Sequence, residues 1–179
     1  MIYPQNFEQK IGFDQIRNLL KNKCLSPLGQ EQVDCMSFSD DFDSINLALE
    51  QVTEFMQIIQ ENDDFPSQYF FDVRPSLKRI RVEGLYMDES ELFDLRRSLE
   101  TIRDIIRYLQ QSDADDSENE AFSSPYPALY ELTKDILTFP LLISQINNIL
   151  DKFGKIKDNA SAELLRIRRE LASTTGSIS

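Results

Sequence analysis

The stretch DESELFDLRRSLETIRDIIRYL, residues 88–109, decides the fold class of this protein. Asp88 precedes an apolar pattern and Glu91 follows three residues later, the arrangement of a helix N-cap with an acid that reaches back to it. The apolar residues recur at alternating steps of three and four, at Leu92, Leu95, Leu99, Ile102, Ile106 and Leu109. This spacing places them on one face of a helix, so the stretch predicts a long amphipathic helix.

The same spacing occurs earlier in the chain. The apolar residues there are Phe42, Ile45, Leu49, Val52, Met56 and Ile59, and Ser39 stands before them as a fitting N-cap. Because each pattern lays one apolar stripe along a helix, we expect these two long helices to pack side by side. Shorter helices are predicted at residues 7–11, 13–22, 27–33, 75–82, 127–136 and 140–150. Asn6 and Ser26 are the expected caps of the first and third of these, and Gly12 is the expected break between the first two.

The composition agrees with a helical fold. The chain has 179 residues, 41% of them hydrophobic, but only five glycines, too few for the frequent turns of a sandwich or barrel. The expected fold class is therefore all-α, an irregular multi-helix bundle whose body is residues 1–158. Residues 112–124 are acidic, rich in Ser and have little to bury, so they predict a mobile loop within this body.

The net charge and the absence of targeting signals limit which classes of partner are expected. The formal net charge is -12, so the chain as a whole repels a phosphate backbone, and any role with nucleic acid must be local. No stretch approaches the roughly 18 apolar residues of a membrane span, and the first residues lack a signal peptide pattern. We therefore expect a cytoplasmic protein with no membrane partner. Cys24 and Cys35 are expected to be buried free thiols.

The sequence lacks the motifs that are typical of catalytic and metal sites. The five glycines lie too far apart for a phosphate-binding loop, and without histidine there is no Ser-His or Cys-His nucleophile pair. Glu89, Glu91 and Glu100 could hold a metal ion in a bundle, but a di-iron site needs Glu-x-x-His pairs, so a solvated acidic face is favoured. We expect no catalytic, cofactor-binding or metal-binding residues here. The aromatic connector at residues 63–75 could form a ligand slot, but packing between crossing helices is favoured.

The last predicted helix has a different pattern. It opens at Ser161 and carries apolar residues and one threonine at heptad spacing, typical of a coiled coil or a long lever: Leu164, Ile167, Leu171, Thr174 and Ile178. We call these five residues the seam. The pattern continues to the end of the sequence at Ser179, so we expect residues 159–179 to be the start of a protruding lever helix that continues in a longer polypeptide.

Basic residues gather in three groups, namely Arg74, Lys78, Arg79 and Arg81; Arg96, Arg97, Arg103 and Arg107; and Arg166, Arg168 and Arg169. Two of the groups lie on helices with acids one turn away, which favours intrahelical ion pairs. The group on the last helix is different, because that helix is expected to reach away from the body. Its three arginines are the candidate residues for contact with a phosphate backbone.

Several strings resemble the core and lever region of MutS-type proteins. Residues 24–31, CLSPLGQE, resemble an early C-x-S-x-L-G-x-E segment, and residues 72–79, DVRPSLKR, are similar to a D-[IV]-R-P-x-L-x-R segment. Residues 157–171, KDNASAELLRIRREL, resemble the D-x-A-S-P-E-L-x-x-I-R-R-E entry into the lever helix, with Ala162 in place of the usual proline. The chain contains no Phe-x-Glu wedge of the kind that mismatch-reading relatives use to unstack a mispair, which makes it similar to the MutS-two branch.

This resemblance implies a parent protein that dimerises, hydrolyses ATP with Mg through a C-terminal ATPase domain and often ends in a small nuclease domain. Such proteins are linked to branched DNA, suppression of recombination and rescue of collided ribosomes. The ATPase and nuclease domains are not in this sequence. We therefore expect a non-catalytic core and lever that couples ATPase state to clamp position and works with the remainder of the same polypeptide. The alternative is a free-standing helical adaptor that binds a partner protein through the seam.

Overall fold

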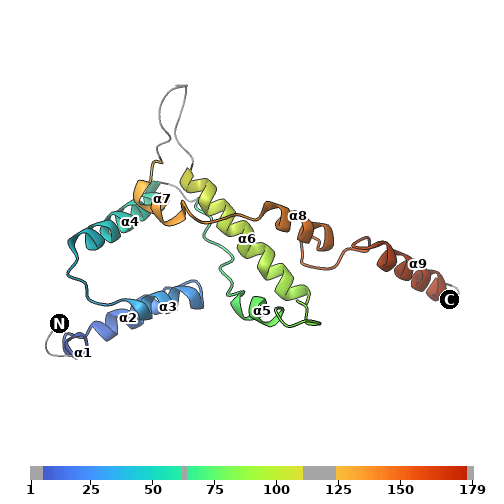
Figure 1. Cartoon of the computed structure of the whole chain (residues 1–179), viewed down its shortest axis with the longest axis horizontal. Coiled ribbons are helices and arrows are strands. Elements are labelled where there is room, and N and C mark those ends of the chain that lie inside the picture. Colours follow the sequence, from blue (N-terminus) through green and yellow to red (C-terminus); the bar gives the residue numbers. More distant parts are fainter. Residues whose placement is uncertain (1–5, 62–63, 111–123, 177–179) are drawn as a thin grey trace, which may run out of the picture. The chain divides into compact units, whose positions relative to one another are not determined.

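The computed structural model describes residues 6–61, 64–110 and 124–176, which form nine helices (Figure 1). These are α1 (Phe7–Lys10), α2 (Phe13–Lys21), α3 (Pro27–Cys35), α4 (Phe42–Glu61), α5 (Arg74–Arg79), α6 (Glu89–Gln110), α7 (Pro127–Thr133), α8 (Pro140–Ile149) and α9 (Ala162–Gly176). In the described ranges, the β pairing is limited to an isolated antiparallel bridge between Leu150 and Ile156. The all-α prediction is confirmed for this part of the chain.

The chain divides into two compact units. Unit 1 comprises residues 1–53 and unit 2 comprises residues 54–179, so the division falls inside α4. The expected boundary after residue 158 separates a body from a lever helix, and it remains a prediction.

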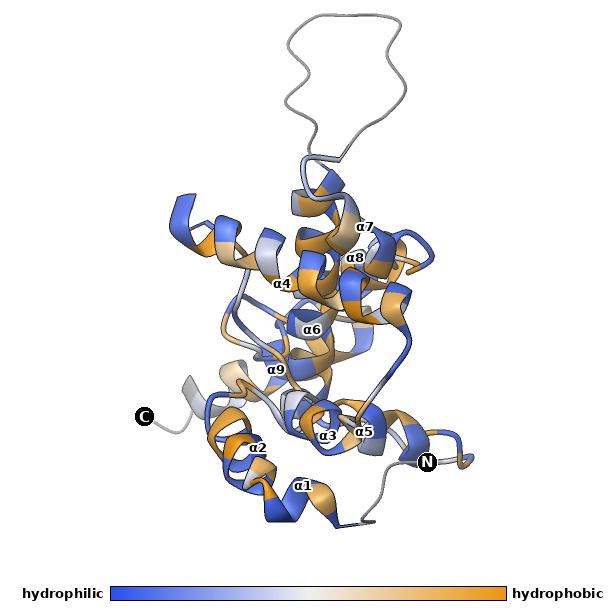
Figure 2. Ribbon diagram, turned by 90° about the vertical axis from the view of Figure 1, so that its left-hand side faces the viewer, coloured by the Kyte–Doolittle hydropathy of each residue, from blue (hydrophilic) through white to orange (hydrophobic). Residues whose placement is uncertain are grey.

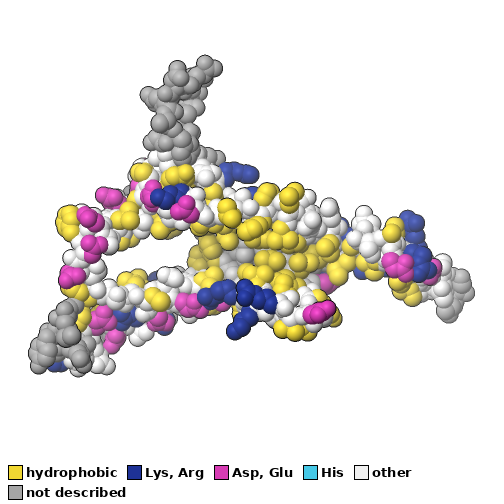
Figure 3. Space-filling model, viewed as in Figure 1, with side chains coloured by type: hydrophobic (Ala, Val, Ile, Leu, Met, Phe, Trp, Pro, Cys, Tyr) yellow, Lys and Arg dark blue, Asp and Glu magenta, His cyan; other side chains and the backbone are white. Residues whose placement is uncertain are grey.

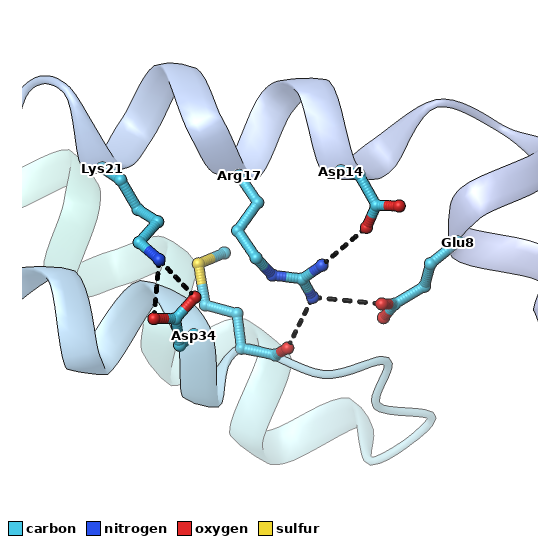
Figure 4. A network of polar contacts seen from close by, with 6 residues as sticks. Glu8, Asp14, Arg17, Lys21 and Asp34 are labelled. Atoms are coloured by element: carbon cyan, nitrogen blue, oxygen red, sulfur yellow. Dashed lines mark hydrogen bonds and ion pairs between the residues drawn. The ribbon is translucent and has the colours of Figure 1, made fainter.

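Unit 1 is held together by polar contacts around Arg17 of α2 (Figure 4). The Arg17 guanidinium contacts Glu8 of α1 at 3.1 Å and Asp14 at 3.2 Å, and it donates to the backbone carbonyl of Met36 at 2.9 Å. Lys21 makes a second link, from α2 to Asp34 of α3. None of the described residues of unit 1 is buried, so these ion pairs link α1, α2 and α3 without a buried apolar core.

The helix starts in unit 1 follow local capping chemistry. Ser26 caps α3, since its Oγ accepts from the Gly29 N–H at 3.3 Å, and Gly12 breaks α1 from α2 in the left-handed region at φ 77°. Asn6 makes no side-chain cap bond, so that prediction is wrong. The Ser39 prediction is also wrong. Asp41 stands directly before α4, and its carboxylate accepts from the Ser44 N–H at 3.1 Å.

In unit 2, α6 contributes to two separate apolar clusters. Near its C-terminal end, Leu109 packs with Ile58 of α4 and Tyr126 next to α7. Nearer its N-terminal end, Leu95 packs with Ile146 of α8 and Leu150. The apolar stripe predicted for residues 92–109 is therefore largely the face that α6 turns to its neighbours, although Ile102 in its middle is 40% exposed. Figure 3 shows that hydrophobic side chains also remain uncovered where α6 and α8 lie.

The predicted N-cap of α6 is confirmed in both directions. The Glu91 N–H donates to the Asp88 carboxylate at 2.8 Å, and the Asp88 N–H donates to the Glu91 carboxylate at 3.0 Å. Glu91 also accepts from the Ser76 hydroxyl at 2.8 Å and pairs with Arg79. The N-terminus of α6 is thus tied to α5.

Hydrophobic and hydrophilic residues alternate along α4 (Figure 2), but the exposed fractions show that the stripe predicted for this helix is exposed. Its six residues are between 39% and 72% exposed, whereas Ile58, which is not part of it, is fully buried. Ile58 lies one turn after Glu54, whose two carboxylate oxygens accept from the N–H groups of Ala128 and Leu129 at 3.0 and 2.8 Å. These contacts select the opposite face of α4.

The prediction that the two long helices pack side by side is wrong within unit 2. There, α4 meets the C-terminal end of α6 through the cluster around Ile58, and α6 packs along α7 and α8 instead. The reason is the Glu54 cap, which directs α4 to the start of α7.

The aromatic connector takes part in packing, and its residues 64–69 also line a pocket of about 400 Å³ against α6. Phe65 makes edge-to-face contacts with Phe55 and Tyr108, with ring centroids 5.2 and 5.3 Å apart, as favoured for the aromatic connector. Residues 112–123 of the expected mobile loop lie outside the described residues. Ser124, the last residue of that range, is buried and its hydroxyl donates to the Leu109 carbonyl at 2.6 Å, and the mobile loop stays a prediction.

The two cysteines are free but not buried. Cys24 is half-buried, with its Sγ 3.3 Å from the Leu20 carbonyl oxygen, and Cys35 is exposed at the end of α3. The prediction of buried thiols is wrong because unit 1 has no apolar core to bury them in.

Candidate functional site

The seam lies on α9, which starts as the sequence predicts. Ser161 caps the helix, since its Oγ accepts from the Leu164 N–H at 3.1 Å. Leu164 is half-buried, whereas Ile167 and Leu171 are 41% and 62% exposed. Thr174 is exposed and bonds the Glu170 carbonyl through its hydroxyl, and Ile178 lies outside the described residues. An apolar strip therefore remains uncovered on the described part of α9.

The three candidate arginines differ in their ion-pair partners. Arg166 pairs with Glu163 at 2.6 Å and Glu170 at 2.7 Å, and these bonds raise the pKa of Arg166, Glu163 first. Arg168 pairs with Asp158, just before the helix. Among the described residues, Arg169 has no carboxylate partner, so it is the candidate arginine with a free positive charge.

The start of α9 is joined to α6 through Glu89. The Glu89 carboxylate accepts from the Ile156 N–H at 3.2 Å and the Lys155 ammonium at 3.3 Å. The Ile156 N–H and then Lys155 lower the pKa of Glu89, with a smaller contribution from the charge of Arg168. The segment that leads into α9 is therefore anchored by hydrogen bonds and charge.

Gly154 makes the close approach in this segment possible. Its φ is +82°, in the left-handed region, and a Cβ there would lie 2.7 Å from ring atoms of Phe93 in α6. The bridge between Leu150 and Ile156 closes the loop around it. Only glycine fits at this position without a shift of Phe93.

The second basic group contains a residue that sequence reasoning misassigned. Arg96 makes no intrahelical ion pair and is only 5% exposed, and its Nη1 donates to the Asn147 side chain and the Asp151 carbonyl, both at 3.0 Å. The signal was present, since Arg96 lies four residues after Leu92 and three before Leu99, on the buried stripe. In the first group, Arg74 pairs with Asp72 and Arg79 with Glu91.

Two of the three acids considered for a metal site form hydrogen bonds and ion pairs with protein groups instead. Glu89 and Glu91 are occupied as described above, and Glu100 is half-buried on α6. The part of the chain that the structure describes has no group of three or more His, Cys, Asp or Glu residues placed to hold a metal ion. Its helices also include none that is long and apolar enough to cross a membrane.

Comparison with known proteins gives one consistent group of relatives. No family model matches the chain. Proteins named Endonuclease MutS2 are similar to it: that of Latilactobacillus sakei subsp. sakei (strain 23K) is 28% identical over 168 residues, and those of Alkaliphilus oremlandii (strain OhILAs) and Clostridioides difficile (strain 630) are 27% identical over 168 residues. Each match covers 94% of this chain and 20% of the relative. The chain thus spans about a fifth of the length of the curated relatives it matches, and its resemblance to the MutS-two branch is confirmed.

Proposed function

From its similarity to Endonuclease MutS2 proteins along 94% of its length, we propose that this chain is a non-catalytic core and lever of a MutS2-type protein. In this role it couples the state of an ATPase to the position of a clamp on branched DNA or collided ribosomes. The observation that carries the proposal is the uncovered seam on α9, at the end of a segment anchored to α6 through Glu89. A helix anchored at one end with a free apolar strip can transmit motion to whatever covers the strip.

The proposal includes the parent protein. It acts in the cytoplasm as a homodimer, uses ATP and Mg in an ATPase domain and cuts DNA through a nuclease domain, all outside this chain. Suppression of recombination and ribosome rescue are the two biological roles that fit it. On α9, Arg169 is the candidate arginine best placed to meet a phosphate backbone, since it has no carboxylate partner among the described residues.

The test changes the seam in the full-length protein. Replacing Ile167 and Leu171 with serine removes apolar contacts of the lever but little buried surface of this chain, because both side chains are exposed. Nucleotide-dependent binding of branched DNA or of ribosomes, measured by filter binding and cosedimentation, is expected to fall at least tenfold. The matched control is Leu141→Ser on α8, where the leucine is 81% exposed and outside the seam. An unchanged nucleotide response in the seam variant contradicts the coupling role.

The second candidate is a helical adaptor that binds a partner protein's helix through the seam. The same exposed Ile167 and Leu171 favour it, since an apolar strip on a helix is the usual element of helix-in-groove recognition. The reading frame downstream of codon 179 separates the two. Continuation into a phosphate-binding loop supports the coupler, and a stop codon near that position supports the adaptor.

A further inference from the structure

A groove on unit 2 lies between α6, the C-terminal end of α8 and the loop at residues 150–157. Its volume is about 440 Å³, within the usual range for ligand pockets of about 300–1,000 Å³. Its charged lining residues are Arg96, Arg97, Lys152, Lys157, Glu100 and Asp151. Four cations and two acids give the lining a net charge of +2, on a chain whose total is -12. We call it the basic groove.

The four cations of the basic groove outnumber its two acids. Among the described residues, none of the four forms an ion pair, although most other arginines of the chain do. The Asp151 carboxylate is turned to its own loop, where it accepts from the N–H groups of Phe153 and Lys155 at 2.8 and 2.9 Å. The Lys155 N–H and then the Phe153 N–H lower the pKa of Asp151, and the charge of Arg96 makes a smaller contribution in the same direction.

Arg96 lines the groove and has a buried N–H donor, at Nε, without a hydrogen-bond partner. Two bonds of its Nη1, to Asn147 and to the Asp151 carbonyl, fix the guanidinium, while its buried Nε has no partner. A buried charged donor without an acceptor is costly, and such a group is satisfied when an anion binds beside it.

Arg97 is fixed beside it by aromatic rings instead of carboxylates. Its guanidinium carbon lies 4.1 Å from the ring centroid of Tyr69 and 4.8 Å from that of Phe93. The Arg96 guanidinium carbon also lies 4.8 Å from the Phe93 ring. Two guanidinium groups are therefore held on one ring, and their mutual repulsion favours an anion that contacts both.

We propose that the basic groove binds a phosphate group. Rigid guanidinium groups donate in pairs to the oxygens of phosphate, and the lysines add flexible positive charge at the rim. Lys157 is tethered by a bond to the Asn147 carbonyl at 2.6 Å, and Lys152 is exposed. The phosphate can belong to a small molecule or to a nucleic acid strand, because the groove contacts only the phosphate oxygens that both share.

The test measures binding of inorganic phosphate to the 179-residue chain by isothermal titration calorimetry. Arg97→Gln and Lys152→Gln each remove one groove cation and are expected to weaken binding roughly tenfold or more, since a hydrogen bond to a charged group is worth about that factor. Arg96 is left intact because its buried bonds support the fold. The matched control is Arg107→Gln, which removes an exposed arginine from α6 outside the groove.

A second arm identifies the source of the phosphate with a short fluorescent oligothymidylate, followed by anisotropy. Binding that inorganic phosphate displaces and that Arg97→Gln weakens assigns the groove to a nucleic acid backbone. If the groove binds inorganic phosphate but not the oligonucleotide, its ligand is a small phosphate compound. Absence of phosphate binding, or equal loss in Arg107→Gln, overturns the proposal. Lys152→Gln keeps the test valid if Arg97→Gln unfolds, and no seam residue is involved, so the coupling proposal is tested separately.

Discussion

At the scale of single residues, Glu91 connects more of the fold than its sequence position suggests. Its carboxylate accepts from the Asp88 N–H and from Ser76, and it pairs with Arg79. These contacts, the Asp88 N–H first, lower the pKa of Glu91 from 4.5 to about 2. The fold therefore favours the charged carboxylate. The stability that depends on this charge is complete above pH 4.5 and is lost as the pH falls from 4.5 toward about 2.

Replacing Glu91 with glutamine tests this pH dependence. The variant is expected to melt at a lower temperature than the unmodified protein at pH 7, and the gap is expected to narrow at pH 3, where the unmodified protein also begins to lose the charge. Thermal unfolding followed by circular dichroism at both pH values measures the gap. Glu83→Gln, at an exposed position before α6, is the control and should show no such change. A gap of equal size at pH 7 and pH 3 contradicts the assignment.

At the scale of elements, α4 shows that a regular stripe does not identify the buried face. The stripe from Phe42 to Ile59 is exposed, while Ile58 is fully buried against Leu109 and Tyr126. The Glu54 carboxylate determines this orientation, because it caps the N-terminus of α7 and lies one turn from Ile58. A helix cap supplied by a distant acid outweighs the local apolar pattern here.

Two neighbouring isoleucines test which face of α4 is buried. Ile58→Ala is expected to destabilise the protein by about 2–5 kcal/mol, because it leaves a cavity in the cluster with Leu109. Ile59→Ala removes the same atoms from a side chain that is 62% exposed, and its effect is expected to stay within about 0.5 kcal/mol. Urea unfolding of both variants measures the difference. Equal losses would mean that the face assignment is wrong.

At the scale of the whole molecule, buried apolar contacts are concentrated in unit 2. Both hydrophobic clusters consist of unit 2 residues, whereas the described residues of unit 1 include no buried side chain. Unit 1 depends on ion pairs such as those of Arg17, and exposed or partly exposed pairs contribute little to folding stability. A stable fold needs a buried apolar core, so unit 2 is the part that supports the structure.

A truncation tests this division. A chain that begins at Asp41 keeps the cap of α4 and both clusters, so it is expected to remain helical and to unfold cooperatively. A peptide of residues 1–40 lacks a core and is expected to show no cooperative transition. Circular dichroism during heating measures both. Loss of the cooperative transition in the longer chain would show that unit 2 needs unit 1.

The helices, most of the predicted caps and the resemblance to the MutS-two branch could be predicted from the sequence. Capping at Asp88 and Ser161 and the period of the stripes depend on residues within a turn or two, so local physics was sufficient. The buried face of α4 and the partners of Arg96 in the basic groove came from tertiary contacts. Those outcomes depend on partners far along the chain, Ala128 for Glu54 and Asn147 for Arg96, and no periodicity in the sequence encodes such a pairing.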